Sequence, residues 1–280
     1  MEKRIDLIIR RALKEDHSDR DITTNILVSP SQTSRAYIIV KENAVVCGLD
    51  VVRAIFQKLD RNMNIKEHAR EGDKVKKGTK IVSLKGKTRA LLTGERVALN
   101  FLSYLSGIAT ITNRFVEKAR PYEVKIMDTR KTLPGLRGLV KMAVRAGGGV
   151  NHRFNLKEMV MIKDNHQIAY QKDKTIQDAI RHVRARTKKM IMVEVDTIIQ
   201  FRQALKGRPD VILLDNMSPK QIGKIVSLNR KSPAPCLLEA SGGINLRNIR
   251  AIAKTGVDRI SIGTLTHSPR AVDFSIEFIA

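Results

Sequence analysis

The pattern of apolar and polar positions divides the chain into two parts with different periodicities. In the first part, up to about residue 109, apolar residues recur at helical spacing over 5–15, 51–59 and 89–106, which predicts amphipathic helices. Short apolar runs at 36–40 and 44–46 predict strands between the first two of these helices. A few strands combined with a few helices indicate an α+β domain.

Beyond residue 121 the pattern changes to short apolar runs that alternate with helical segments, which is typical of a parallel sheet built from βα units. The strands are predicted near 124–127, 159–162, 190–195, 211–214, 237–239 and 259–262. The helices are predicted near 175–187, 198–205, 219–228 and 246–255. About six such units are too many for a small sheet and too few for a closed eightfold barrel.

The chain is therefore predicted to be an α/β protein of two domains. Residues 1–109 would form an N-terminal α/β sandwich (α+β) domain, and residues 110–267 an open, incomplete α/β barrel of about six strands. Residues 268–280 are expected to pack back on the N-terminal domain. A length of 280 residues allows two domains, each with its own hydrophobic core.

Polar or small residues follow each predicted strand of the second domain. They are Arg130 and Lys131, Lys163, Glu194 and Asp196, Asp215 and Asn216, Glu239 with Ser241, Gly242 and Gly243, and finally Gly263 and Thr264. The carboxyl ends of parallel strands meet at one edge of a sheet, where α/β proteins usually build their active sites. A single acid after a strand is commonly a helix N-cap, and we assign that role to Asp196. The remaining residues predict a site.

Cations dominate the stretch from Asp128 to His166. It contains eight Lys or Arg residues against three acids, and a triple glycine at 147–149 leads into His152 and Arg153. A cation in a basic protein is most often a solvated surface group. Because several of these cations lie at strand ends, they instead favour a pocket for a small ligand with several negative charges, such as carboxylates or phosphates.

Two turns of small residues are candidates for phosphate binding. The run ASGGI (240–244) precedes a helix expected to begin near Asn245, and GTLTHS (263–268) forms a second turn. Backbone N–H groups at a helix N-terminus attract phosphate. The chain has no Cys or Ser nucleophile beside a base and no full GxGxxG fingerprint, which disfavours covalent catalysis and hydride transfer. A phosphosugar bound with its metal fits better.

The net charge of +24 raises nucleic acid as a partner, but its distribution disfavours this class of ligand. Cations exceed acids by 8 in residues 1–100, by 10 in 101–200 and by 6 in 201–280, so no basic arm or stripe stands out. Aromatic residues make up 4% of the chain and Trp is absent, which leaves few platforms for base stacking. We expect no nucleic-acid partner and keep a nucleic-acid-binding module only as the weaker alternative function.

Cysteine content and hydropathy indicate where the protein works. Cys47 and Cys236 lack metal-ligand spacing and are too few for a disulfide scaffold. No apolar run approaches membrane-spanning length, and the first residues lack the apolar centre of a signal peptide. We expect a cytoplasmic protein with no membrane partner.

Three motifs, DTRKTLPGLR (128–137), GGGVNHRFNL (147–156) and MIKDNH (161–166), resemble the signature of the quinolinate phosphoribosyltransferase family, also called carboxylating nicotinate-nucleotide pyrophosphorylases. TGERVALN (93–100) is a further match, and the resemblance covers nearly the whole chain. It implies an enzyme that joins quinolinate to 5-phosphoribosyl-1-pyrophosphate and releases pyrophosphate and carbon dioxide. The product, nicotinate mononucleotide, would serve NAD synthesis. A paralogous phosphoribosyltransferase with a different acid substrate is the main alternative.

The resemblance also implies roles for the strand-end residues. Arg130, His152, Arg153 and Lys163 would hold the two ring carboxylates, Lys131, Glu194 and Asp215 would be catalytic, and Ser241, Gly242, Gly243, Gly263 and Thr264 would bind substrate. Lys131 would bind the phosphoribosyl substrate near its pyrophosphate. Glu194 and Asp215 would hold ribose hydroxyls and, through indirect contacts, Mg²⁺ as the cofactor. Arg96 matches a family arginine that enters the partner subunit's pocket, which implies a homodimer with shared active sites that could assemble into a hexamer.

Overall fold

The structure is a computed structural model that describes residues 2–170 and 175–279. It divides into two compact units. The first contains the chain up to residue 113, residues 132–148 and the chain from residue 268, and the second contains residues 114–131 and 149–267. The predicted boundaries did not assign 132–148 to the first unit. The reason for its position is packing, because this segment carries a helix whose apolar face belongs to the first core.

A four-stranded antiparallel sheet forms the first unit, with strand order β12-β1-β5-β3. Its strands are β1 (Thr33–Val40), β3 (Asn64–Glu67), β5 (Lys80–Lys87) and β12 (Phe274–Ile279), and a separate two-stranded ribbon joins β2 (Ala44–Val45) to β4 (Lys74–Val75). The side chains of Ala36, Ile38 and Val40 alternate along β1 and are buried. Strand β12, from the C-terminal end of the chain, pairs with β1 and completes the sheet; Ile279 of β12 lies opposite Arg35 of β1.

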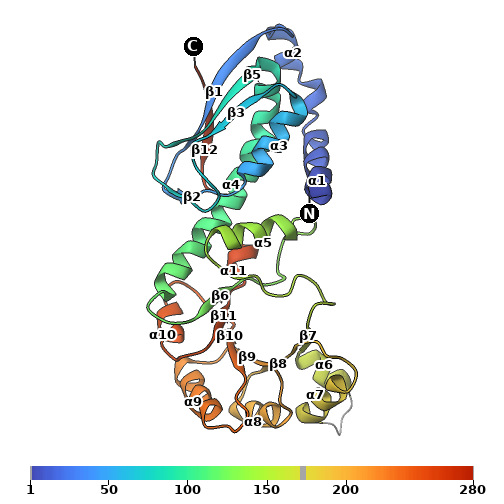
Figure 1. Ribbon diagram of the computed structural model, residues 1–280, viewed down its shortest axis with the longest axis vertical. Helices are drawn as coiled ribbons and strands as arrows, with labels where there is room; N and C mark the ends of the chain where they lie inside the picture. Colours follow the sequence, from blue (N-terminus) through green and yellow to red (C-terminus); the bar gives the residue numbers. More distant parts are fainter. Residues whose placement is uncertain (1, 171–174, 280) are drawn as a thin grey trace. The chain divides into compact units, whose positions relative to one another are not determined.

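The helices of the first unit are α1 (Glu2–Glu15), the short 3₁₀ helix η1 (Ser18–Arg20), α2 (Ile22–Leu27), α3 (Leu49–Leu59), α4 (Thr88–Ala119) and α5 (Arg137–Ala146). Helices α3 and α4 lie along one face of the sheet (Figure 1), and Phe56, Leu102 and Leu105 share one core with Ile38 of β1. Burying side chains of this size contributes about 1.5–3 kcal/mol each. Val140 of α5 joins the same core.

Helix α4 is longer than the sequence pattern predicts. Its predicted end lay at residue 106, but it continues to Ala119 because Ile108, Ala109 and Phe115 extend its buried stripe. Gly107 lies inside this helix, where a Cβ atom would collide with the carbonyl oxygen of Arg270. The glycine therefore permits a close approach of backbone segments.

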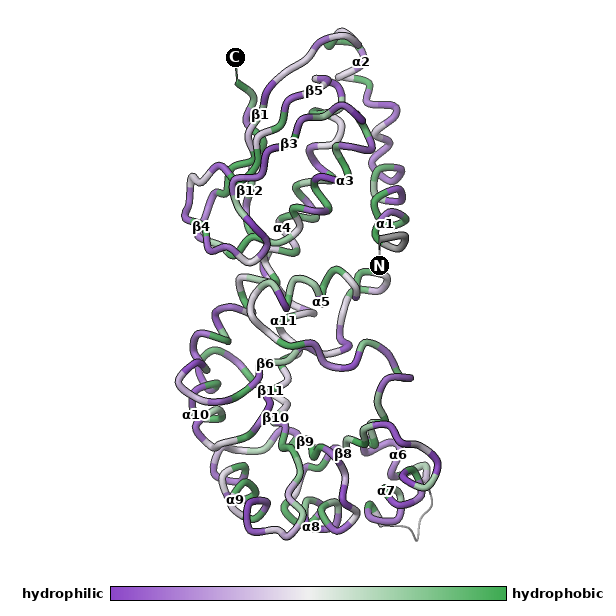
Figure 2. Tube along the Cα trace, viewed as in Figure 1, coloured by the Kyte–Doolittle hydropathy of each residue, from purple (hydrophilic) through white to green (hydrophobic). Residues whose placement is uncertain are grey.

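Six parallel strands form the sheet of the second unit, in the order β6-β11-β10-β9-β8-β7. They are β6 (Lys125–Met127), β7 (Val160–Ile162), β8 (Ile191–Val195), β9 (Val211–Asp215), β10 (Leu237–Ser241) and β11 (Arg259–Ser261). The edge strands β6 and β7 are not paired with each other in the described part of the chain. This confirms the predicted open barrel of six strands. Strand β9 is almost entirely hydrophobic (Figure 2), as expected for a strand that is buried on both faces.

Helices lie around the outside of this sheet (Figure 1): α6 (Asp164–Tyr170), α7 (Ile176–Arg184), α8 (Ile198–Lys206), α9 (Pro219–Arg230) and α10 (Ile249–Ala253). The short helix α11 (Thr264–His267) instead follows the carboxyl end of β11. Side chains of Thr175 and Ser218 cap α7 and α9 with capping boxes. The assignment of Asp196 as an N-cap was wrong, because Thr197 caps α8 by accepting from the N–H of Gln200. None of the helices in the described residues is long and apolar enough to span a membrane.

Candidate active site

A pocket of about 600 Å³ lies at the carboxyl ends of the parallel strands, within the second unit. The sequence-predicted residues that line it are Arg130, Lys131, His152, Arg153, Lys163, Glu194, Asp215, Ser241, Gly242, Gly243, Gly263 and Thr264. They come from the ends of all six strands and from the segment after the triple glycine. Residues distant in sequence thus converge because parallel strands all end at the same edge.

One wall of the pocket is cationic. Arg130 follows β6, Arg153 lies in the segment before β7, and Lys163 follows β7. The guanidinium of Arg153 donates to the carbonyl oxygen of Met159 at 3.0 Å and contacts the sulfur of Met161 at 3.3 Å, which fixes its plane. Burial lowers the pKa of Arg153, and the neighbouring Arg130 cation lowers it further. Because the two guanidinium groups repel each other, an anion bound between them would stabilise both.

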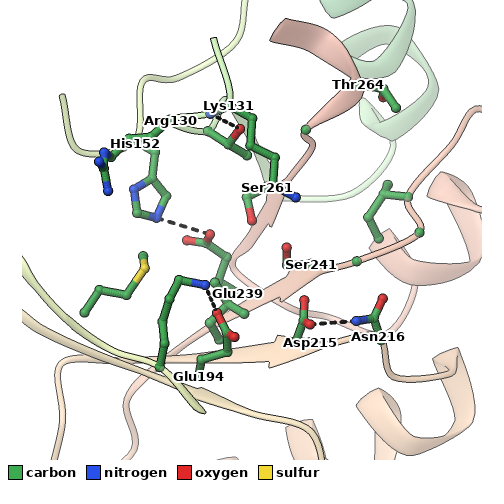
Figure 3. A pocket seen from close by; sticks show the side chains of 18 of the residues that line it. Arg130, Lys131, His152, Glu194, Asp215, Asn216, Glu239, Ser241, Ser261 and Thr264 are labelled. Carbon is green, nitrogen blue, oxygen red and sulfur yellow. Dashed lines mark hydrogen bonds and ion pairs between the residues drawn. The ribbon is translucent and has the colours of Figure 1, made fainter. Parts of the chain in front are cut away.

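Lys163 and Glu194 form an ion pair across the ends of β7 and β8 (Figure 3). The lysine side chain is 42% exposed and the glutamate 15% exposed, so the carboxylate is the more enclosed partner. The lysine ammonium is a compact charge on a flexible chain, so it can also reach a ligand anion. Glu194 thus lies next to the cationic wall and is the first residue of the acidic side of the pocket.

Asp215 ends β9 on the acidic side of the pocket, and Asn216 orients it. The amide of Asn216 donates to the Asp215 carboxylate at 2.6 Å (Figure 3). Asn216 has a φ of 53°, in the left-handed region that asparagine tolerates better than most residues, and its backbone N–H donates to the Ser241 carbonyl at 2.9 Å. A Cβ at Gly242, which has a φ of 85°, would collide with the Asn216 side chain. The ends of β9 and β10 therefore fit together only with glycine there.

The two glycine turns line the pocket, but only one is followed at once by a helix. Gly263 leads directly into α11, and Thr266 of that helix donates from its hydroxyl to the Lys131 carbonyl at 2.7 Å, which anchors the lysine's backbone. After Gly242 and Gly243 the helix expected near Asn245 begins only at Ile249. The expected start was wrong because the side chains of Asn245 and Asn248 donate to the Gly243 carbonyl and form a turn instead.

Two family models match the chain. That of the quinolinate phosphoribosyl transferase C-terminal domain matches residues 108–277, and that of the N-terminal domain matches residues 21–106. The chain belongs to the quinolinate phosphoribosyltransferase family.

Named relatives agree with this membership. A probable carboxylating nicotinate-nucleotide pyrophosphorylase of Bacillus subtilis is 43% identical over 92% of this chain and 89% of its own length. One from Methanocaldococcus jannaschii is 40% identical over 97% of this chain and 96% of its own length. The solved nicotinate-nucleotide pyrophosphorylase of Francisella tularensis is 36% identical, with a TM-score of 0.91 over 100% of this chain and 97% of the other.

One residue that the family resemblance singled out lies elsewhere. Arg96 is exposed on α4 in the first unit and is not among the residues that line this pocket. Its expected role in a partner subunit's pocket stays a prediction.

The sequence of this quinolinate phosphoribosyltransferase family member gave no role to the other residues that line the pocket. They are Thr129, Met161, Leu213, Asn216, Glu239, Ile244, Ser261 and His267. Ser261 ends β11, so the expectation that site residues lie at strand ends could have identified it. Asn216 and Glu239 were recognised as strand-end residues but were given no role. His267 ends the short helix α11, and no sequence signal indicated it.

Proposed function

We propose that this protein transfers the phosphoribosyl group of 5-phosphoribosyl-1-pyrophosphate to quinolinate, with decarboxylation. The products are nicotinate mononucleotide, pyrophosphate and carbon dioxide. The observation that carries this proposal is the division of one pocket into a cationic wall and an acidic wall with glycine turns. The names of relatives at about 40% identity over nearly the whole chain support the same reaction.

The cationic wall suits the two carboxylates of quinolinate. Arg130 and Arg153 present planar groups that bind carboxylates through paired hydrogen bonds, and Lys163 adds a third positive charge. A monocarboxylate could not engage all three cations. The substrate class proposed for this wall is therefore a small aromatic dicarboxylate.

The opposite side suits the phosphosugar. Lys131 is exposed and anchored through its own carbonyl, so its ammonium can reach the pyrophosphate. The backbone of Ser241–Gly243 and of Gly263–Thr264 can approach phosphate closely, because glycines leave no side chain in the way. Glu194 and Asp215 would accept hydrogen bonds from ribose hydroxyls.

Mg²⁺ is proposed as the cofactor, and the donor set fits it. Across the described residues, no three His, Cys, Asp or Glu side chains converge on a full metal cage. Mg²⁺ is commonly held by one or two carboxylates together with substrate phosphates and water, and Glu194 and Asp215 are two carboxylates in one pocket. When bound, the ion would neutralise negative charge on the pyrophosphate.

In the proposed reaction the ring nitrogen of quinolinate forms a bond to the anomeric carbon while the bond to pyrophosphate breaks. Glu194 and Asp215 would stabilise the positive charge that develops on the sugar. The carboxyl group beside the ring nitrogen then leaves as carbon dioxide, its electron pair remains on the ring carbon next to the pyridinium nitrogen, and a proton replaces it. The cationic wall holds the ring still throughout, which supplies the orientation.

We also propose a homodimer in which Arg96 enters the partner's pocket. Such dimers could assemble further into a hexamer. The exposure of Arg96 on α4 leaves its guanidinium available for such a contact. The proposed location is the cytoplasm. Both cysteines are unpaired, as is usual in a reducing compartment. No nucleic acid or membrane is proposed as a partner.

Incubation with quinolinate, phosphoribosyl pyrophosphate and Mg²⁺ tests the function. Nicotinate mononucleotide should form, and label placed in the carboxyl group beside the ring nitrogen should leave as carbon dioxide in equal amount. A parallel panel of other aromatic acids tests the paralogue alternative. Turnover of one of these acids without turnover of quinolinate would reject the proposed substrate but keep the phosphoribosyl transfer.

A further inference from the structure

Glu239 is the most enclosed acid of the pocket wall. It lies in the middle of β10, and its side chain is 0% exposed. Neither carboxylate oxygen has a hydrogen-bonding partner among the residues that the structure describes. The imidazole Nε2 of His152 lies 3.4 Å from one of these oxygens, which is within ion-pair distance but does not make a well-formed hydrogen bond (Figure 3).

A buried carboxylate of this kind is costly for the fold. Burying a charge or a polar group without hydrogen bonds destabilises a protein, whereas an apolar side chain of similar size at the same place would not. Stability alone therefore does not account for an acid at position 239. Both oxygens are nearly sealed from solvent although the residue lines the pocket, so we look for the role of the carboxylate in the side chain that it faces.

His152 is that side chain, and two contacts define its state. A parallel bridge between Met127 and Val150 places the segment that contains His152 beside β6. The backbone N–H of His152 then donates to the buried Asp128 carboxylate at 2.8 Å. The backbone N–H of Arg153 donates to Nδ1 of the His152 ring at 2.8 Å. A backbone amide can only donate, so Nδ1 carries no proton. The ring is therefore neutral, and its proton lies on Nε2, the atom that faces Glu239.

We propose that Glu239 is a positioning residue that holds the His152 ring in its Nε2–H form, and that the ring in turn fixes the backbone of Arg153 in the wall that binds the substrate's carboxylates. This rests on the proposed function and revises the expected role of His152. The imidazole acts as a link between β10 and Arg153 instead of as a fourth cation. Hydrogen bonds of catalytic sites commonly tighten when substrate binds, and the 3.4 Å contact is expected to shorten in the quinolinate complex.

Nitrogen NMR of the labelled protein tests the link without any turnover. The chain has 6 histidines, and the His152 signals are identified by their loss in His152→Gln. We expect a protonated Nε2 and an unprotonated Nδ1 at neutral pH in the wild-type protein. A doubly protonated ring, or a proton on Nδ1, would overturn the proposal.

Two variants at position 239 test the effect on substrate. Glu239→Leu removes the acceptor that faces Nε2–H, so the ring should lose its fixed orientation and, with it, its bond to the Arg153 N–H and its single tautomer. Quinolinate affinity should then fall about tenfold, the loss expected when a hydrogen bond to a charged group is removed. The Michaelis constant for phosphoribosyl pyrophosphate should change little. Glu239→Gln retains an acceptor oxygen and should keep the tautomer and most of the affinity, which also covers the case in which the leucine variant does not fold.

Glu158→Gln is the matched control. Glu158 is exposed and accepts from the backbone N–H of Phe154 at 2.6 Å, so this variant removes a negative charge from the same segment without replacing the group that faces the His152 ring. It should keep both the tautomer and the affinity. Equal losses in Glu158→Gln and Glu239→Leu, or normal affinity in a folded Glu239→Leu, would reject the positioning role.

Calorimetric titration with quinolinate separates this inference from the proposed function. If the wild-type protein shows the predicted tautomer but binds no quinolinate, the proposed substrate fails and the Glu239–His152 link stands. If quinolinate binds and the tautomer is different, the link fails and the proposed substrate stands.

Discussion

The two sheets of the molecule treat charge in opposite ways. In the antiparallel sheet of the first unit, charged groups lie on the solvent side in exposed pairs, such as Lys41 with Glu277 at 2.5 Å. In the parallel sheet of the second unit, acids such as Glu194 and Glu239 lie at or near the carboxyl ends of strands and are mostly or fully buried. Antiparallel neighbours end at opposite edges, so their polar termini scatter, whereas parallel strands collect theirs in one place.

We expect chemistry at the second sheet and a supporting role for the first. Charge in the second sheet should be costly for stability and useful for binding, and charge in the first sheet should be nearly neutral for both. Substitutions in the two sheets should therefore separate activity from stability.

The largest effect is expected for Lys163→Ala and Arg153→Ala. Each removes a cation from the wall proposed for quinolinate, and turnover should fall by about 100-fold or more, while thermal melting changes little because neither side chain is part of the hydrophobic core. Steady-state kinetics and melting curves measure the two quantities. Lys41→Ala in the first sheet is the control and should leave both unchanged. If the melting temperature falls sharply while the remaining folded protein keeps normal kinetics, these cations support the structure instead of the substrate.

Next in size is the discrimination between quinolinate and nicotinate. Nicotinate lacks one carboxylate, so it leaves a cation of the wall unpaired, at a cost of about 1 to 3 kcal/mol or more. The specificity constant kcat/KM for nicotinate should therefore be lower by about 5- to 150-fold. The assay compares both acids at saturating phosphoribosyl pyrophosphate. Comparable values would mean that the cationic wall does not read the second carboxylate.

A smaller effect is expected when two inactive variants are combined in one dimer, so that one copy of the chain supplies Arg96 and the other supplies Lys131. Arg96→Ala and Lys131→Ala should each be nearly inactive, and refolding them together should restore about a quarter of wild-type activity, because half of the dimers are mixed and each has one intact pocket. Mass spectrometry confirms the mixed dimers, and each mutant refolded alone is the control. Mixed dimers without recovery would show that Arg96 serves its own chain or no site.

The smallest effect concerns the opposite edge of the parallel sheet, where charge supports structure. The Asp210 carboxylate accepts from the backbone N–H of Ile191 at 2.7 Å and from Arg184 at 2.6 Å. Burial raises its pKa, but these bonds outweigh burial and hold the pKa below its ordinary value. A lowered carboxylate pKa adds stability above the ordinary value of 3.8, and this stability is lost as pH falls through the folded-state pKa.

Asp210→Asn should therefore lower the free energy of unfolding by about 1 kcal/mol at neutral pH, a modest figure because the pair is partly exposed. Urea unfolding should show this difference shrinking under acid conditions. Glu277→Gln in the first sheet, which loses an exposed pair, should show no measurable change at either pH. A difference that stayed constant down to strongly acid pH would rule out the carboxylate as its source.

The sequence was sufficient for the parts of the molecule that follow a local period. The six strands and the polar residues at their ends could be predicted because each βα unit repeats the same short pattern, and helices α7, α8, α9 and α10 were placed to within about three residues. The short helices α6 and α11 were not predicted. Features that depend on tertiary contacts were missed. Helix α4 extends past residue 106 because its later turns are buried, and α5 belongs to the first unit because of Val140 and its neighbours.

The site shows the same limit. Individual cations and acids could be assigned from their motifs, but the contact between His152 and Glu239 joins residues on separate strands and segments, and no local pattern encodes it. The Asn216 side chain against Gly242 is a similar case, since only the folded strand ends reveal that a Cβ would collide there.

The position of β12 has a consequence for how the protein is made. This strand pairs along β1, and Val272, Phe274 and Ile276 fill the core of the first unit. During synthesis on the ribosome, residues 33–40 emerge early and must wait for residues 274–279 before their sheet is complete. The second unit, residues 114–131 and 149–267, leaves the ribosome in between and can fold first. The part of the chain that is translated first is therefore among the last to be finished, and until then one edge of β1 remains open to chaperones or to unwanted strand pairing.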